Sequence, residues 1–377
     1  MSKRFLITII TLAVIAFSAG IAIFLAKGYT FSPTEKRIVG TGIINITSEP
    51  DAASVFIDGH LTTATNATVS SLSPKSYTVR VVKEGFIPWE RLVEVKEGVV
   101  TAVKVTLFPA IPTIYPLTFS GVLNPSLSPD GSKLAYIVPA NNNNLKKAGV
   151  WVWTMVRNQP IAFARSSEPH QIASNTTTDF SKATLKWSPD SKQVLAVTPT
   201  ATVDGNNYLL ESESMNNDPR DITPILSATL SAWEEDIESK EMARVMTIND
   251  DRLRKIASDS ASLSWAPDET KFMASSSAEV KVYDLEDNER SSSVSKDYKL
   301  PKALAYIWLP DSRHIVLVEE GAISMVDFDG TNKAVIYVGK FEDSFVFPWP
   351  DSSRFVIISS FPTPTASEPN LYGINLR

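Results

Sequence analysis

Leu127-Ser128-Pro129-Asp130-Gly131 is the first of five copies of a Pro-Asp turn in the last two thirds of this 377-residue chain. Each copy follows an apolar strand end and precedes a new apolar run. Proline presets φ at about −65° for the second position of a type I turn, and the aspartate accepts hydrogen bonds from nearby backbone amides. A fixed turn between two apolar strands, repeated along a chain, predicts an all-β repeat architecture. The other copies are Trp187-Ser188-Pro189-Asp190-Ser191, Trp265-Ala266-Pro267-Asp268-Glu269, Trp308-Leu309-Pro310-Asp311-Ser312 and Pro348-Trp349-Pro350-Asp351-Ser352.

The spacing of the copies indicates the size of one repeat. Successive turn prolines lie 60, 78, 43 and 40 residues apart, and the last two spacings match the roughly 40 to 45 residues of a four-stranded propeller blade. Residues 225–259 contain no Gly or Pro and have apolar side chains three and four apart, which predicts a helical insertion in the longest gap. We therefore predict five blades, or six if that gap contains a degenerate repeat.

The repeat region resembles the TolB-like and WD-repeat-like β-propellers, whose blades carry a Ser-Pro-Asp-Gly turn between their first two strands. Only the first copy here keeps the glycine. The resemblance covers Thr113 to Arg377 and implies an architecture but no particular activity. We place the whole propeller at residues 110–377. We expect residues 111–117 to pair with residues 370–374, which would remove the sheet edges. The tryptophans before the turns are expected in the core, with a sugar-stacking platform as the alternative interpretation.

The amino-terminal segment from Phe5 to Ala26 contains no charged residue over 22 positions. A helix of that length would extend ~33 Å, enough to cross the hydrocarbon core of a bilayer. It exceeds the apolar region of a typical signal peptide, and no A-x-A cleavage site follows it. We interpret it as an uncleaved transmembrane signal anchor, with a cleaved signal sequence as the alternative. Residues 1–4 would then be cytoplasmic, residues 27–40 a stalk, and the bulk of this single-pass cell-membrane protein extracytoplasmic.

Residues 41–109 are predicted to form a small β-sandwich, with strands at 43–46, 54–57, 77–82 and 99–107 and a turn at Asp58-Gly59. The stretch from Ser48 to Gly59 resembles the PEGA domain, because residues 50–53 stand for the tetrapeptide that names that family. Ala52 replaces the usual glycine, and Ser76 stands where a glycine commonly precedes the tyrosine. The resemblance implies a binding or spacer module of the cell envelope, and it assigns no catalytic residues.

Composition excludes several classes of function. The net charge is −6 and no run of Lys or Arg is present, so we do not expect nucleic-acid binding. The chain has no cysteine, which excludes disulfides, thiolate metal sites and cysteine nucleophiles. Its hydrophobic fraction of 43% is that of a folded protein, and its length predicts two or three folded units.

The sequence offers few candidates for catalytic or metal-binding residues. No G-x-S-x-G motif is present, and His60, His170 and His314 are interpreted as ordinary turn or strand residues. Two Asp- and Asn-rich stretches, 204–207 and 327–332, superficially resemble calcium loops, but both lie where a hairpin turn is needed. We predict no catalytic, cofactor-binding or metal-binding residues, and ligand-binding residues remain unassigned.

An acidic patch lies in the predicted insertion and consists of Glu234, Glu235, Asp236 and Glu238. At the start of a helix such side chains would interact favourably with the helix dipole. The alternative is that the insertion, which interrupts the repeat, is where a partner docks.

The predicted function is that of a non-catalytic binding or interaction protein at the cell envelope, held in the lipid bilayer by its anchor. The expected partner is an envelope protein or glycan. An alternative is a propeller hydrolase or lyase that acts on an envelope polymer with acidic residues at the central channel. A third reading is a purely structural spacer.

Overall fold

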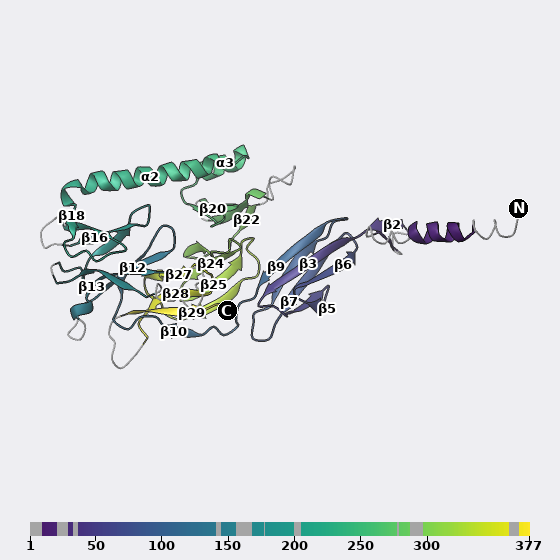
Figure 1. Ribbon diagram of the computed structural model, residues 1–377, viewed down its shortest axis with the longest axis horizontal. Coiled ribbons are helices and arrows are strands. Elements are labelled where there is room, and N and C mark those ends of the chain that lie inside the picture. Colours follow the sequence, from purple (N-terminus) through teal and green to yellow (C-terminus); the bar gives the residue numbers. More distant parts are fainter. Residues whose placement is uncertain are drawn as a thin grey trace. The chain divides into compact units, whose positions relative to one another are not determined.

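The computed structural model describes residues 10–20, 29–32, 37–140, 145–155, 168–176, 178–199, 205–276, 279–286, 297–361 and 369–377 (Figure 1). The chain divides into two compact units, Met1–Ile111 and Pro112–Arg377.

Part of the predicted membrane anchor is described. Residues 10–20 are helical, whereas residues 5–9 and 21–26 of the anchor lie outside the described residues. Among the residues that are described, no helix has both the length and the apolar character needed to cross a bilayer. The anchor therefore stays a prediction. Within the predicted stalk, β1 (Tyr29–Ser32) and β2 (Arg37–Gly40) pair in antiparallel register.

The first unit contains a two-sheet sandwich. One sheet has the order β6-β3-β9 and the other β5-β4-β7-β8, with β3 and β9 parallel. Apolar side chains of both sheets, among them Ile44, Val55, Val79 and Val105, form one core. The strands are β3 (Gly42–Glu49), β4 (Ser54–Ile57), β5 (His60–Ala64), β6 (Ala67–Leu72), β7 (Ser76–Val82), β8 (Trp89–Glu94) and β9 (Val100–Thr106).

The turns of this sandwich have the backbone geometry that their sequence predicts. Asp58 and Gly59 both have positive φ, 48° and 80°, which suits the tight hairpin between β4 and β5. Ala52 also lies in the left-handed region, at φ 53°. Since glycine tolerates that region without a steric penalty, the structure accounts for the glycine that PEGA sequences usually have there.

The second unit contains five four-stranded antiparallel sheets in its described residues. Four are meanders of consecutive strands, and the fifth combines both ends of the unit, because β10 pairs with β29. This pairing confirms the predicted closure. The blades are: blade 1, β11 (Leu123–Leu127), β12 (Lys133–Val138), β13 (Gly149–Thr154), β14 (His170–Ser174); blade 2, β15 (Thr184–Trp187), β16 (Gln193–Thr198), β17 (Asn206–Glu211), β18 (Arg220–Asp221); blade 3, β19 (Leu263–Trp265), β20 (Lys271–Ser276), β21 (Glu279–Asp284), β22 (Asp297–Lys299); blade 4, β23 (Ala305–Trp308), β24 (His314–Glu319), β25 (Ala322–Asp327), β26 (Ala334–Val338); blade 5, β27 (Val346–Pro348), β28 (Arg354–Ser359), β29 (Asn370–Asn375), β10 (Ile114–Pro116).

All five Pro-Asp turns adopt one conformation. The residue before proline accepts a hydrogen bond from the amide three residues later, at 2.8–3.0 Å, as in Gly131 N to Ser128 O. The aspartate side chain accepts from the amide two residues later, at 2.8–3.2 Å, as in Ser132 N to Asp130 Oδ1. The predicted type I and Asx turns are therefore confirmed. The residue after each aspartate is left-handed: Gly131, Ser191, Glu269, Ser312 and Ser352, with φ between 58° and 68°.

The turn residues also join neighbouring blades. The indole of Trp187 donates to Ser126 O of blade 1 at 2.8 Å, and that of Trp308 donates to Ser264 O of blade 3 at 3.1 Å. The left-handed serines make a second link, because Ser191 Oγ accepts from Asp130 N at 3.3 Å and Ser312 Oγ accepts from Asp268 N at 3.0 Å. At these two positions a serine stands where the first copy has glycine, and its hydroxyl bonds the preceding turn.

The predicted helical insertion is confirmed and consists of α2 (Leu226–Met246) and α3 (Asp251–Asp259), after the 3-10 turn η3 (Thr223–Ile225). Two other short 3-10 turns are η1 (Leu145–Lys147) and η4 (Glu342–Ser344). In Figure 1, α2 runs as one long helix from the side of β18 towards α3 and β20. The deepest residue of α3, Leu253, packs against Phe272 of blade 3.

The insertion occupies the place of a neighbouring blade. Phe272 and Ala274 correspond in repeat position to Val194 and Ala196 of blade 2, which pack against blade 1. Blade 3 packs this face against the helices. Its Trp265 indole donates to Glu241 Oε1 at 2.7 Å, and its left-handed Glu269 pairs with Arg244 at 3.1 Å. The helices thus replace both bonds that join two blades: Glu241 accepts the indole bond, and Arg244 takes the place of the preceding turn as the partner of the left-handed residue.

The left-handed serines of the turns in blades 4 and 5 yield a test. Ser352→Gly should raise the free energy of unfolding by up to about 1 kcal/mol, because glycine relieves the left-handed strain. Ser312→Gly should gain less, since it also removes the bond to Asp268 N, a loss of about 1 kcal/mol. Urea unfolding of the three proteins measures the difference, and equal gains would show that the Ser312 bond contributes nothing.

Candidate functional site

The Pro-Asp turns of four blades converge on one cavity of about 630 Å³, which we call the turn pocket. Its walls combine the repeated prolines and the ends of the first strands with a nearly equal share of polar surface. Arg244 reaches it from α2. The lining residues are Leu127, Pro129, Asp130, Gly131, Ser132, Met155, Arg244, Trp265, Ala266, Pro267, Glu269, Ile307, Trp308, Pro310, Pro348 and Pro350.

The charged groups of the turn pocket already have partners. Arg244 pairs with Glu269. Asp130 accepts from the hydroxyls of Ser128 at 2.6 Å and Ser132 at 2.8 Å. Burial alone would raise the pKa of Asp130, but these hydrogen bonds outweigh it and hold the pKa below its usual value. The pocket therefore combines apolar contact area with polar groups that are already bonded within the protein, which suits a partner segment that buries an apolar side chain there.

The tryptophans that precede the turns differ in how deeply they are buried. Trp187 and Trp308 are buried, with 5% and 6% exposure, so the core interpretation holds for them. Trp265 is only half-buried, because a helix lies on its outer side in place of a blade. The edges of Trp265 and Trp308 line the turn pocket.

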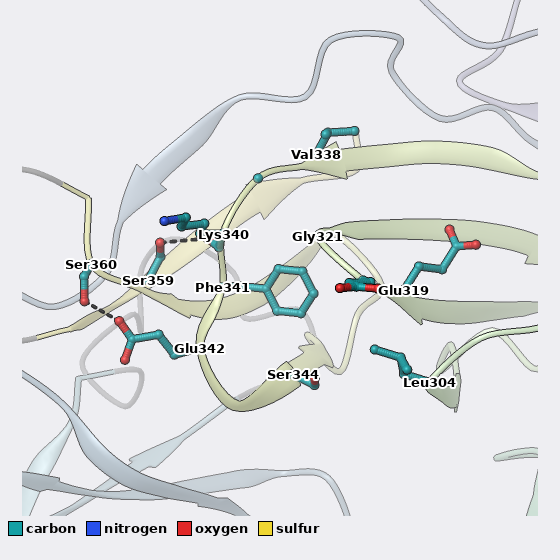
Figure 2. Close-up of a pocket in the computed structure, with 12 residues that line it drawn as sticks. Leu304, Glu319, Gly321, Val338, Lys340, Phe341, Glu342, Ser344, Ser359 and Ser360 are labelled. Carbon is teal, nitrogen blue, oxygen red and sulfur yellow. Dashed lines mark hydrogen bonds between the residues drawn. The ribbon is translucent and has the colours of Figure 1, made fainter.

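A second concavity lies between blades 4 and 5, at the strand ends opposite the Pro-Asp turns (Figure 2). It measures about 600 Å³ and is bordered by the β24–β25 turn, the segment after β26 and the end of β28. The ring of Phe341 points into its middle. Glu319 is engaged by Lys333 at 2.6 Å and Ser324 at 2.5 Å, and Glu342 by Ser360. These contacts make the groove part of the blade junction.

The three histidines are not brought together. His60 is exposed at the start of β5, where Nδ1 lies 3.0 Å from Asp58 O, and His170 Nε2 lies 3.1 Å from Ser212 O in the other unit. His314 is more than an ordinary strand residue. It is 4% exposed, with Nδ1 2.5 Å from Asp311 and Nε2 3.4 Å from Asp327.

Both calcium-like stretches can be assessed in part. Asp327 faces His314 and accepts from Asn332 Nδ2 at 2.9 Å, while Asp329 accepts from the amide and hydroxyl of Thr331. These are hairpin-turn contacts. Asp204 lies outside the described residues, and β17 begins at Asn206. Within the described ranges, no group of three or more His, Cys, Asp or Glu side chains is placed to hold a metal ion.

The dipole interpretation of the acidic patch is wrong. The helix begins at Leu226, eight residues before Glu234, and its first turn contains no acidic residue. The patch therefore lies in the middle of α2, where the dipole has little effect. Asp236 forms an i,i+4 ion pair with Lys240 at 2.7 Å.

One repeated polar position escaped the sequence analysis. The residue that opens the second strand of each blade is long and polar, and it faces the last residue of the third strand, as Lys271 faces Asp284 and His314 faces Asp327. The sequence shows this regularity, because the polar residue always lies five positions after the residue that precedes the turn proline. The five are Lys133, Gln193, Lys271, His314 and Arg354.

Comparison with known proteins supports part of this picture. Residues 41–111 match the family described as the PEGA domain, which confirms the resemblance seen around residues 48–59. No curated protein matches the chain.

Similar solved structures include putative TolB from Agrobacterium tumefaciens, with 15% identity and a TM-score of 0.24 over 76% of this chain and 86% of that one. TolB from Acinetobacter baumannii has 11% identity and a TM-score of 0.23 over 80% and 60%. The β-propeller domain of the Trilobed protease from Pyrococcus furiosus has 11% identity and a TM-score of 0.19 over 89% and 84%. The propeller architecture itself follows from the sheet order and closure.

The buried histidine predicts a pH dependence. Burial alone would lower the pKa of His314, but hydrogen bonds to Asp311 and Asp327 raise it to about 9. The stabilisation is complete below pH 6.5, the ordinary histidine value, and is lost as the pH rises through about 9. Relative to His314→Gln, the free energy of unfolding should fall by about 3 kcal/mol between pH 6 and 10. Denaturant unfolding at several pH values measures it, and parallel profiles would contradict the charged histidine.

Proposed function

We propose that this protein is a membrane-anchored, extracytoplasmic and non-catalytic binding protein of the cell envelope, which holds an apolar segment of a partner protein in the turn pocket. The observation that carries the proposal is the pocket itself, where the turns of four blades and α2 surround about 630 Å³ with Pro, Trp, Leu, Ile and Met side chains and with polar groups from Asp130, Ser132, Arg244 and Glu269.

The character of the pocket favours a protein segment over a glycan. A sugar presents hydroxyls that need several free hydrogen-bonding groups at fixed positions. Here Arg244 is paired with Glu269, and Asp130 is bonded by two serine hydroxyls. Half-buried Trp265 supplies an aromatic surface of the kind that anchors binding energy at protein interfaces.

The envelope location rests on two features outside the propeller. The PEGA domain at residues 41–111 belongs to a family of envelope modules, and the uncharged segment from Phe5 to Ala26 has the length of a membrane span. Together they support a chain that is fixed to the bilayer at one end and presents the propeller to the envelope.

The anchor is tested by fractionation of the full chain. We expect the protein to remain in the membrane pellet after alkaline carbonate washing and to be digested by protease added outside intact spheroplasts. A variant that lacks residues 5–26 should be absent from that pellet. Release of a shortened chain from the membrane would instead indicate a cleaved signal sequence.

The pocket is tested by crosslinking in cells with the full chain. A photo-reactive amino acid in place of Ser132, which lines the pocket, should capture one envelope protein. The same group at Val335, 49% exposed on the edge strand β26, should not capture it. Ile307→Asp should reduce capture at least tenfold by placing a charge on the pocket wall, whereas Val335→Asp should not. Equal capture from both positions, or adducts with glycan only, would contradict the proposal.

A further inference from the structure

A groove of about 460 Å³ lies between α3 and the strands of blade 3 against which that helix packs, and we call it the α3 groove. The helix lines it with residues at positions i, i+3, i+4 and i+7, which share one side of a helix. The volume falls within the range of small-molecule sites, roughly 300 to 1,000 Å³. The lining includes Arg252, Lys255, Ile256 and Asp259 from α3 and Ala274, Ser275 and Tyr283 from β20 and β21.

Four polar side chains of the α3 groove are unpaired in the part of the chain that the structure describes. Arg252, Lys255, Asp259 and Ser275 form no side-chain hydrogen bond or ion pair with a described residue. The turn pocket differs, because its cation, Arg244, is already held in an ion pair. A ligand that is rich in hydroxyls needs several polar groups that are available at fixed positions. The α3 groove offers such groups.

Tyr283 supplies a fifth polar group, which is held in place. Its side chain is only 9% exposed, and its ring stacks on Phe272 at 5.1 Å. Burial raises the pKa of the hydroxyl against the opposing charges of Lys281 and Arg252, so the hydroxyl stays protonated and can donate. It bonds no described residue, yet among the described side chains the one fully enclosed polar atom without a partner is Asn207 Oδ1. The Tyr283 hydroxyl therefore keeps contact with the open space that it lines.

The α3 groove has a cationic end and an acidic end. Arg252 lies at the end where its charge acts on Tyr283. Asp259 lies seven residues further along α3, ~10 Å away at ~1.5 Å per residue, and the adjacent Ser260 Oγ is 3.5 Å from Ser275 O. The last turn of α3 contains no basic residue, so the helix dipole opposes the charge of Asp259. Hydrogen-bond donors of a ligand would offset that repulsion.

We propose that the α3 groove binds a sugar unit that bears a carboxylate. Arg252 and Lys255 pair with the sugar's carboxylate, since a guanidinium matches that group with two parallel hydrogen bonds. Asp259 accepts hydrogen bonds from sugar hydroxyls, and the Tyr283 hydroxyl donates one. Ile256 provides apolar surface between the two ends for the C–H groups of the ring.

The charge of the α3 groove favours a carboxylate over a phosphate. Arg252 and Lys255 carry two positive charges against the single negative charge of Asp259, which matches a monoanion. A phosphate monoester carries nearly two negative charges at neutral pH. The site is separate from the turn pocket and takes a different class of ligand, so this proposal and the proposed function stand or fall separately.

Binding is tested with the full chain in detergent micelles on an array of glycans that differ in their acidic group. We expect retention on glycans with uronic or sialic acid units and only background on neutral glycans of the same backbone. Calorimetry then compares the best glycan with its carboxyl-reduced form, which should bind at least tenfold more weakly. No retention on any carboxylate glycan, or equal binding of neutral or sulfated glycans, would overturn the proposal.

Variants of the lining locate the bound glycan. Arg252→Gln together with Lys255→Gln should weaken binding at least tenfold, because the carboxylate loses both cations. Tyr283→Phe should weaken it about three- to tenfold, since it removes one hydrogen bond while the ring keeps its stack on Phe272. Thermal unfolding of each variant checks that the fold is retained. Undiminished binding by the double variant would contradict the site.

Two controls complete the comparison. Arg220→Gln together with Lys302→Gln removes two exposed cations of the same unit that do not line the α3 groove, and it should leave glycan binding unchanged. Ile307→Asp alters the turn pocket and should also have no effect on the glycan. An equal loss of binding in the first control would show that general positive charge, and no particular site, attracts the glycan.

Discussion

Every four-stranded blade has two apolar faces, and both must be covered. In blade 1 the side chains of Leu134 and Tyr136 meet blade 5, whereas those of Ala135 and Ile137 meet blade 2. Alternation along a strand makes this division unavoidable, since neighbouring side chains point to opposite sides of a sheet. The ring, its pocket and its helical insertion all follow from that requirement. Where a blade is missing beside blade 3, something else has to cover Phe272 and Ala274, and the helices do so.

Much of this fold is predictable because it depends on interactions between residues that are close in the sequence. Proline and aspartate define each turn through their own backbone and side-chain geometry, so five copies predict five hairpins without knowledge of long-range contacts. The helical insertion is predictable for the same reason, from apolar residues at helical spacing. The closing pair of strands required a topological argument, and Gly373 shows how tightly it fits, since a Cβ there would lie 2.7 Å from the Tyr115 ring.

The candidate sites were less accessible, because they depend on contacts between residues far apart in the chain. Nothing in the neighbourhood of Arg244 indicates that it lines a cavity with turn prolines of four blades. His314 looks ordinary until Asp327, thirteen residues later, is placed against it by the strand register. The acidic residues were assigned to the start of the helix because the N-cap residue, Ile225, has no side chain that can cap and so gives no start signal in the sequence.

The closing sheet also governs the order in which the molecule can assemble. β10 lies at the beginning of the propeller unit, and its partner β29 ends at Asn375. The backbone of Ile114 can therefore be paired only after Ile374 has been synthesised. Contacts between such distant segments form late, because the conformational entropy of closing a long loop is lost before the contacts can stabilise the chain. During synthesis, the first four blades can therefore collapse as they appear, whereas blade 5 has to leave one edge open until the final strand arrives. Until then, the unpaired edge strand of blade 5 can pair wrongly with another copy of the chain.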